Sequence, residues 1–352
     1  MARFNIPGFL DAEIEYYSRQ IVLDSIGLSG QRKLKNAKVC VIGLGGLGSP
    51  IVIKLATMGV GHLRVVDRDI VEASNLQRQH LYGMEMLGYP KVEAAAMRVS
   101  GLNPHIEVEP IPMSVTPGNA EWIVDGMDVV VDGLDMMTPR YALNRACVKL
   151  DIPFVFGAAI TNVGSTSTIV PRKTPCVECF QGGIDDDDLP TCAVAGVHPS
   201  ILNIIASIQV SETVRLIMGR KPNLAGAIMY CDLEDLSFER IELARVSSCP
   251  VCGSNPPSEP VPLKNNSFEE ICGRDGKRVF VFSPDEDLCI DLTSLNAKLE
   301  LLNFHITVRA KFGTSFVKGA LKGSVLSSGV TVIEGVNKPE VARRIRSEIL
   351  SI

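Results

Sequence analysis

The sequence of 352 residues predicts an α/β fold, in which a mostly parallel sheet carries helices on both faces. An apolar run at 39–42 is followed by a glycine-rich turn and then by the amphipathic pattern of Ile51, Leu55 and Met58. Strand-like runs then alternate with helix-like patterns as far as residue 157. Two Cys-x-x-Cys pairs beyond that point add a zinc-bound knuckle of four cysteines.

The glycine-rich turn places Gly43, Gly45 and Gly48 at the spacing G-x-G-x-x-G between a strand and a helix. In that Rossmann-like arrangement, backbone N–H groups and the start of the helix approach a phosphate. Glycine is needed because the backbone turns tightly and no Cβ can stand between it and the ligand. The turn therefore predicts a nucleotide site without specifying the nucleotide.

Composition and charge narrow the class of protein. A net charge of −5 gives no support for a general nucleic-acid surface. No signal-type apolar core follows the N-terminus. No apolar run is expected to reach membrane-spanning length, because Asn203, Ser207 and Gln209 interrupt the longest candidate at 201–210. We therefore expect a soluble cytoplasmic protein, whose ten cysteines suit metal binding better than disulfides.

An N-terminal helical arm is expected at 1–36, before a nucleotide-binding domain at 37–254. Residues 8–35 have an amphipathic helical pattern, with Asp11 as a candidate N-cap. Taken alone, Arg19 is expected to be a solvated helix residue, although an arm in this position often packs on a partner subunit.

The second strand, expected at 62–66, ends in Asp67, 24 residues after Gly43. That spacing suits a carboxylate that binds a ribose hydroxyl, and the alternative is an acid that caps the following turn. Arg78 and Lys91 follow, and such cations suit the β- and γ-phosphates of ATP better than a nicotinamide site. Each of them alone is more often only a surface charge.

A second acidic position, Asp135, follows the apolar strand expected at 128–131. It lies on the carboxyl edge, where parallel sheets bind ligands. Asp135 suits a Mg²⁺ ion that bridges phosphates, and it also suits the N-cap of a helix that begins near Thr138. The other elements expected here are a strand at 102–112, a helix at 119–126, a helix at 139–150 and a strand at 153–157.

The two Cys-x-x-Cys pairs consist of Cys176 with Cys179 and Cys249 with Cys252. Four thiolates make a closed tetrahedral zinc site, which leaves no open position for catalysis. Thioredoxin-like redox pairs are the alternative, but neither pair opens a helix after a strand in the expected way. The pairs are therefore expected to hold a structural zinc.

Between these pairs, four aspartates at 185–188 predict a mobile, solvated loop, and Cys192 follows it. An accessible thiolate there would attack an activated acyl group, whereas the plain alternative is a small buried side chain. A long helix is expected at 198–218, and a hairpin at 226–231 and 237–243.

A Pro-rich linker at 255–265 leads to a small α+β domain at 266–352. Cys272 and Arg278 have the spacing of sulfurtransferase and phosphatase loops. The pattern at 267–271, however, predicts a helical turn and not the strand that such a loop follows, so we treat the match as chance. The elements expected here are strands near 278–282, 304–311 and 330–334 and helices near 291–302 and 339–350.

Taken together and in order, these signals resemble one family: the ubiquitin-activating-type adenylyltransferases that charge small sulfur-carrier proteins in molybdopterin and thiamine biosynthesis. The resemblance covers residues 15–253. It rests on both cysteine pairs and on short motifs at 17–21, 43–48, 66–69, 75–79, 90–91, 132–135, 157–159 and 191–192.

The resemblance implies a site for ATP and Mg²⁺. Gly46 would lie against the nucleotide, Asp67 would bind the ribose and Asp135 would hold Mg²⁺. Asn75, Arg78 and Lys91 would contact phosphates. The full set that it assigns to the nucleotide is Gly43, Gly45, Gly46, Gly48, Asp67, Asp69, Asn75, Gln77, Arg78, Lys91 and Asp135.

The resemblance also implies the reaction and its partners. The C-terminal Gly-Gly carboxylate of a ubiquitin-like carrier would attack the α-phosphate of ATP, and cations would offset the charge of the two anions. Arg19 would reach the phosphates of the neighbouring subunit, so a homodimer would be needed. Cys192 matches a cysteine that forms a thioester or persulfide in some members, with a cysteine desulfurase or rhodanese as sulfur donor.

The chain also departs from the family. Met136 stands where the family usually has Asn, which removes a polar contact near the adenine or the metal. The C-terminal domain is not a rhodanese, and its stretch at 329–343 resembles short tails of some prokaryotic members. Three alternatives remain. The first is adenylation of a carboxylate on modified tRNA, and this reaction needs a basic surface. The others are an NAD-dependent oxidoreductase and an inactive scaffold subunit.

Overall fold

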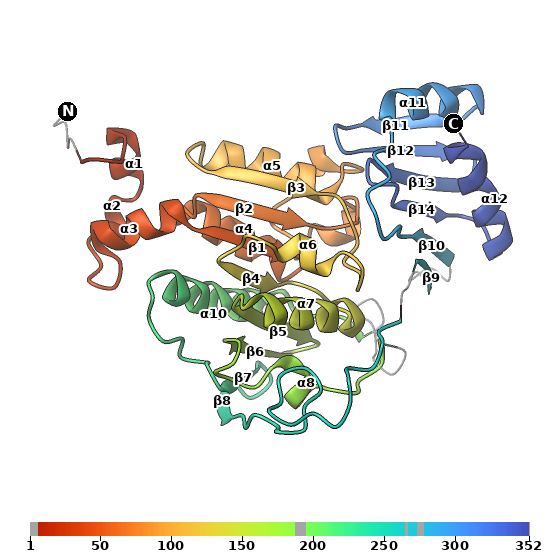
Figure 1. The fold of residues 1–352 in the computed structure, drawn as a ribbon. Coiled ribbons are helices and arrows are strands. Elements are labelled where there is room, and N and C mark those ends of the chain that lie inside the picture. Colours follow the sequence, from red (N-terminus) through yellow and green to blue (C-terminus); the bar gives the residue numbers. More distant parts are fainter. Residues whose placement is uncertain (1–5, 187–194, 265–266, 273–277, 352) are drawn as a thin grey trace.

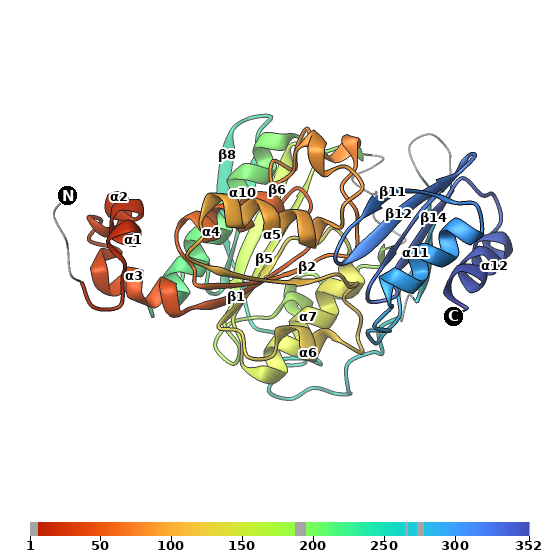
Figure 2. The same cartoon turned by 90° about the horizontal axis from the view of Figure 1, so that it is seen from above.

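The computed structural model describes residues 6–186, 195–264, 267–272 and 278–351, and it contains two sheets (Figure 1). The eight-stranded sheet forms the body of the molecule, and the six-stranded sheet lies beside it. Figure 2 shows the N-terminal helices at one end, the large sheet in the middle and the small sheet at the other end.

The large sheet confirms the predicted α/β class. Its order is β3-β2-β1-β4-β5-β6-β7-β8, in which β1 to β5 form the parallel part and β6 to β8 extend it antiparallel. The strands are β1 Lys38–Ile42, β2 His62–Val66, β3 Glu107–Ile111, β4 Val129–Asp132, β5 Phe154–Ile160, β6 Val163–Ile169, β7 Ala227–Asp232 and β8 Ser237–Glu242.

Alternate side chains of β1 explain why helices cover both faces of this sheet. Val39 and Val41 point into a core shared with α4, α5 and α10, whereas Cys40 and Ile42 point into a second core shared with α6 and α7. All four side chains are buried, as a parallel strand covered on both sides requires. The helices of this part are α4 Gly48–Thr57, α5 Lys91–Leu102, α6 Ala120–Val124, α7 Met137–Leu150, α8 Val177–Phe180 and α10 Pro199–Ile217, with short 3₁₀ turns at Ala73–Asn75 and Met84–Met86.

Helix α10 is long and apolar enough to cross a membrane by length and composition alone, which the sequence analysis did not expect. Its side chains nevertheless bond to the sheet beneath it. Gln209 donates to the carbonyl oxygens of Asp132 and Val155, and the Glu212 carboxylate accepts from the Thr168 hydroxyl. Both polar side chains are buried, so α10 is a core helix of the large sheet.

The N-terminal arm differs from the single helix expected at 8–35. It consists of three short helices, α1 Asp11–Tyr16, α2 Ser18–Ile21 and α3 Gly27–Asn36. The N-cap of α1 is Leu10 and not Asp11, and the backbone N–H of Leu10 donates to the carboxylate of Glu13.

The small sheet is antiparallel, in the order β11-β12-β13-β14-β10-β9, and its two helices pack on one face. The three predicted strands and both helices of this part are confirmed. The elements are β9 Phe268–Cys272, β10 Arg278–Phe282, α11 Leu292–Leu301, β11 His305–Arg309, β12 Gly313–Lys318, β13 Leu321–Leu326, β14 Thr331–Glu334 and α12 Pro339–Leu350.

Three strands of the small sheet, β9, β12 and β13, were not predicted. The helical turn expected at 267–271 is wrong, because Phe268–Cys272 pairs with Arg278–Phe282 as an antiparallel edge strand. Pairing with a neighbouring strand satisfies the backbone polar groups of this segment and outweighs its short helical pattern.

Candidate active site

A cavity of about 500 Å³ lies at the carboxyl edge of the parallel strands. Its walls are the glycine turn after β1, the turn at 67–69 after β2, the segment at 113–117 after β3 and the segment at 133–140 after β4. Ligands of parallel α/β sheets bind at this edge, so the cavity is the candidate nucleotide site.

The glycine turn has the tight shape that its spacing predicts. Gly43 has a φ of +79°, and a Cβ on it would lie 2.7 Å from the carbonyl oxygen of Gly133. A Cβ on Gly48 would lie 1.7 Å from the carbonyl oxygen of Gly43. Gly43, Gly45 and Gly46 line the cavity, whereas Gly48 begins α4 and packs beneath the turn.

Asp67 joins the glycine turn to the turn after β2. Its carboxylate accepts the backbone N–H of Leu44 at 2.6 Å and that of Asp69 at 2.7 Å. Desolvation raises the pKa of Asp67, and the nearby charge of Lys91 opposes that rise. Lys91 donates to the Asp69 carboxylate at 2.7 Å. Although desolvation opposes its charge, Asp67 and Asp69 raise the pKa of Lys91, so its ammonium stays protonated beside the cavity.

Arg78 supplies a second cation to the cavity wall. Its guanidinium donates to the carbonyl oxygen of Ser74 at 2.9 Å, and in the part of the chain that the structure describes it has no carboxylate partner. Asn75 lines the same wall, but Gln77 is exposed and lies outside the lining. Gln79, two residues further on, is buried and lines the cavity. Of the two glutamines in the 75–79 motif, Gln79 lines this cavity and the predicted Gln77 does not.

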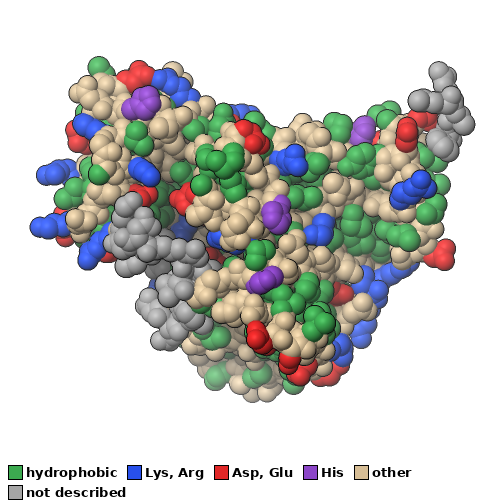
Figure 3. All heavy atoms as spheres, turned by 180° about the vertical axis from the view of Figure 1, so that it is seen from behind, with side chains coloured by type: hydrophobic (Ala, Val, Ile, Leu, Met, Phe, Trp, Pro, Cys, Tyr) green, Lys and Arg blue, Asp and Glu red, His purple; other side chains and the backbone are tan. Residues whose placement is uncertain are grey.

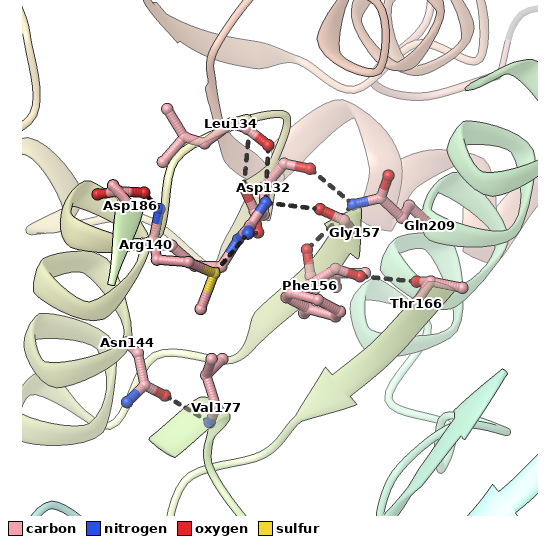
Figure 4. Close-up of polar contacts among 12 residues, drawn as sticks. Asp132, Leu134, Arg140, Asn144, Phe156, Gly157, Thr166, Val177, Asp186 and Gln209 are labelled. Atoms are coloured by element: carbon pink, nitrogen blue, oxygen red, sulfur yellow. Dashed lines mark hydrogen bonds and ion pairs between the residues drawn. The ribbon is translucent and has the colours of Figure 1, made fainter. Parts of the chain in front are cut away.

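Asp135 lies on a loop of the cavity wall. The buried ion pair of Asp132 and Arg140, drawn in Figure 4, supports this loop. The Arg140 guanidinium donates to the Asp132 carboxylate at 2.6 Å, and the two side chains are 4% and 0% exposed. Arg140 also donates to the carbonyl oxygens of Leu134 and Gly157. Arg140 was not predicted, because its neighbours in the sequence do not show that α7 buries it under this loop.

The first residues of α7 are capped from another loop. The backbone N–H groups of Met137 and Thr138 donate to the carboxylate of Asp186. The N-cap alternative for Asp135 is therefore wrong, and that carboxylate is left exposed on the cavity wall.

Asp185 pairs with Lys264 at 2.8 Å, so the first aspartates of the loop make defined contacts and are not a freely solvated run.

Cys192 lies outside the described residues. Arg19 is exposed on α2, which lies at the end of the molecule away from the small sheet, and it does not line the cavity (Figure 1).

The four cysteines of the two Cys-x-x-Cys pairs form one cluster. Their sulfur atoms all lie within 4.8 Å of one another, with Cys176 and Cys249 at 3.7 Å and Cys179 and Cys252 at 3.4 Å. Thiolates bound to zinc at about 2.3 Å in a tetrahedron have sulfur atoms roughly 3.8 Å apart. The donor set and its spacing therefore fit zinc.

The pattern of the ThiF family matches residues 17–251. The chain belongs to the ThiF family. This ThiF-family chain is 41% identical over 246 residues to a SAMP-activating enzyme E1 of Haloferax volcanii, covering 69% of this chain and 91% of the relative. It is 37% identical over 267 residues to a sulfur carrier protein adenylyltransferase of Thermus thermophilus, covering 74% and 97%.

The fold of this ThiF-family chain is also similar to a crystal structure of E. coli MccB with ATP, with a TM-score of 0.56 and 24% identity over 64% of this chain and 68% of the other. That likeness shows the fold alone. The predicted family is confirmed, and with it the class of enzyme, an adenylyltransferase of the ThiF type.

Proposed function

We propose that this protein adenylates the C-terminal Gly-Gly carboxylate of a ubiquitin-like sulfur-carrier protein. The observation that carries the proposal is the cavity under the glycine turn, where Arg78 and Lys91 lie on the walls with Asp67 and Asp135. The names of the two relatives, a SAMP-activating enzyme and a sulfur carrier protein adenylyltransferase, support the same reaction.

In the proposed reaction a carboxylate oxygen of the carrier forms a bond to the α-phosphorus of ATP, the bond from that phosphorus to the bridging oxygen breaks, and pyrophosphate leaves. Two anions must meet, and charge builds on the leaving group, so fixed cations lower the barrier. Arg78 suits this role because no carboxylate neutralises it among the described residues. Lys91 is held by Asp69 and stays charged.

The same proposal assigns the remaining polar groups. Asp67 binds the ribose, Asn75 contacts phosphate, and the glycine turn lets the backbone approach the nucleotide. Asp135 would hold Mg²⁺, for which a single exposed carboxylate together with substrate phosphates is a suitable donor set. When bound, Mg²⁺ would neutralise phosphate charge.

We further propose that the protein is a cytoplasmic homodimer with a structural zinc in the cysteine cluster. The zinc would join two segments far apart in the chain. Arg19 does not line its own cavity, so a role at the phosphates would come from a second copy. Val22 and Leu23 beside it are exposed apolar residues that such a copy would cover.

After adenylation, the Cys192 thiolate would attack the acyl carbon and release AMP to form a thioester. Alternatively, it would accept the outer sulfur of a persulfide on a cysteine desulfurase or rhodanese, whose cysteine is left as a thiol. The tRNA alternative gains no support from the net charge or from the one face of the molecule that Figure 3 shows. The face seen in Figure 3 carries basic, acidic and apolar side chains interspersed, and the net charge is −5.

The test is ATP–pyrophosphate exchange with the Gly-Gly-ended carriers of the source organism, each compared with a copy that lacks the last glycine. We expect exchange only with an intact carrier. In Arg78→Ala the exchange rate should fall about 100-fold or more, because a cation aimed at the developing charge is gone. Arg98→Ala, which removes an exposed arginine of α5, should exchange at the wild-type rate. Exchange that persists in Arg78→Ala, or is absent with every carrier, contradicts the proposal.

A further inference from the structure

The cavity has a wall that the parallel sheet does not supply. Glu269, on the edge strand β9 of the small sheet, is one of its lining residues. The Glu269 carboxylate accepts two hydrogen bonds from the Arg68 guanidinium, at 2.6 and 2.8 Å. Arg68 stands between Asp67 and Asp69 and also lines the cavity. The small sheet therefore reaches the candidate nucleotide site directly.

This ion pair is shielded and oriented. The side chains of Arg68 and Glu269 are 19% and 14% exposed, and the bidentate geometry fixes the plane of the guanidinium. The Arg68 guanidinium also lies 3.9 Å from the sulfur of Met136 and 4.0 Å from the carboxylate of Asp69. Arg68 thus spans from the turn after β2 to the loop after β4, across one side of the cavity.

A second contact places the small sheet behind the neighbouring wall. The hydroxyls of Ser114 and Ser283 lie 2.6 Å apart, and Ser328 donates to the carbonyl oxygen of Pro112. Ser114, Ser283 and Ser328 are all buried. The cavity segment at 113–117 is therefore supported by the small sheet through bonded side chains.

The order of the strands indicates which end of a nucleotide these walls meet. The glycine turn follows β1, and Asp67, at the ribose position, follows β2. The next strand outward is β3, which the 113–117 segment follows. A nucleotide with its phosphates at the glycine turn and its ribose at Asp67 would extend its base toward this segment, on the side of the cavity that Arg68 joins to Met136.

We propose that the small sheet completes the base end of the nucleotide site, with Glu269 as a positioning residue that holds Arg68 against the base. The inference rests on the proposed use of ATP in this cavity. A planar guanidinium held in place is suited to stacking on an aromatic base. Met136 lacks the polar side chain that the family usually has at this position. The Arg68 guanidinium, 3.9 Å from the Met136 sulfur, lines the cavity there instead.

The small sheet is not part of the shared ThiF pattern. The Haloferax relative is matched over 246 residues, which are 91% of its length. The ThiF pattern itself ends at residue 251, before the small sheet begins.

The test compares nucleotide binding to the full-length protein by isothermal titration calorimetry, without carrier. In Glu269→Gln the Kd for ATP should rise about tenfold, since an uncharged amide no longer fixes Arg68. The Kd for inorganic tripolyphosphate, which has no base, should stay within about twofold of wild type. Glu270→Gln is the matched control, because it removes the same charge from the same strand at a residue that pairs with Arg278.

A double-variant comparison separates positioning from mere domain packing. If Glu269 acts through Arg68, then Glu269→Gln adds no further loss of ATP affinity in an Arg68→Ala background. Unchanged ATP affinity in Glu269→Gln, or equal loss for ATP and tripolyphosphate, would overturn the proposal. A wild-type protein that binds ATP but performs no carrier-dependent exchange would count against the proposed reaction alone.

Discussion

Gly45 and Gly48 belong to one motif, yet they should respond differently to the same substitution. A Cβ on Gly48 meets the carbonyl oxygen of Gly43, so Gly48→Ala should displace the turn, lower the melting temperature and abolish ATP binding. A Cβ on Gly45 meets only the end of Gln79, at 3.9 Å. Gly45→Ala should keep the melting temperature and weaken ATP binding, because its methyl group points at the lined cavity.

The control for both variants is Gly101→Ala. Gly101 lies in α5 with open space where a Cβ would be, so alanine should stabilise the protein by roughly 0.5–1 kcal/mol. Differential scanning calorimetry measures the melting temperature of each of the three variants, and titration with ATP measures its affinity for the nucleotide. Equal behaviour of Gly45→Ala and Gly48→Ala would contradict the geometry of the turn.

A second prediction concerns the buried pair of Asp132 and Arg140. Arg140→Ala leaves a fully buried carboxylate without its cation and should lower the free energy of unfolding by about 3–5 kcal/mol. Lys149→Ala breaks an exposed pair of the same helix, with side chains 66% and 50% exposed, and should cost no more than about 1 kcal/mol. Urea denaturation at neutral pH measures both.

The loss in Arg140→Ala should depend on pH. Desolvation raises the pKa of Asp132, and Arg140 opposes that rise, so the pKa goes higher in the variant. With a folded pKa above the unfolded value, the folded state takes up a proton first as the pH falls. The deficit relative to the wild type should therefore shrink as the pH falls from the folded pKa of Asp132 in the variant to its lower, though also raised, folded pKa in the wild type. If the loss of unfolding free energy in Arg140→Ala did not change with pH, the charge of Asp132 would not be its cause.

At the scale of elements, α7 depends on a cap that lies far from it in the chain. Asp186→Ala removes the acceptor for two backbone N–H groups of α7 and should lower the free energy of unfolding by about 1 kcal/mol. Asp185→Ala, which removes an adjacent carboxylate paired with exposed Lys264, should change it by less than about 0.5 kcal/mol. Thermal unfolding that ranks these variants in the opposite order would exclude the cap.

The elements also show what sequence patterns can predict. The parallel strands and long helices of the large sheet were predictable, since apolar runs such as 39–42 alternate with helical periodicity. Strand β12 was not, because its buried residues include Gly313, Thr314 and Ser315, which make no apolar alternation. Ser315 is buried against the large domain, where its hydroxyl bonds to the carbonyl oxygen of Gly88.

The site likewise contains residues that a local sequence motif identifies and residues that only the folded structure reveals. Residues named by motifs, such as Asp67, Arg78 and Lys91, were found because their neighbours in the sequence identify them, and the structure brings them to one cavity. Glu269 reaches its place through a pair with Arg68, a residue 201 positions away. Arg140 pairs with Asp132, only 8 positions away, but the loop and helix between them decide whether the two side chains meet. No local pattern signals such a contact, so only the structure reveals it.

At the scale of the whole molecule, the cysteine cluster joins two segments 73 residues apart. Metal analysis should find one zinc per chain. Its removal with a chelator should lower the melting temperature, because four thiols lose their common partner. Cys289→Ser, which changes an exposed cysteine outside the cluster, should leave the zinc content and the melting temperature unchanged. A chain without metal and with unchanged stability would contradict the zinc assignment.

A homodimer with Arg19 in the neighbouring site makes a prediction that mixing can test. Arg19→Ala and Arg78→Ala should each be inactive alone. After equal amounts are mixed and exchanged, half of the dimers hold one intact site, so about a quarter of the wild-type activity should return. If Arg19 acts in its own chain, the mixture stays inactive, and if Arg19 has no role, Arg19→Ala is active before mixing.

The distance along the chain between the two sides of the cavity bears on how the protein is made. Backbone N–H groups of Lys311 and Phe312 donate to the Glu93 carboxylate, so the small sheet docks on segments synthesised more than two hundred residues earlier. At about 5–20 residues per second, a ribosome needs roughly ten seconds or more to span that interval. A nascent large sheet therefore waits with its cavity open on one side, and a folding factor or bound nucleotide has that interval in which to act.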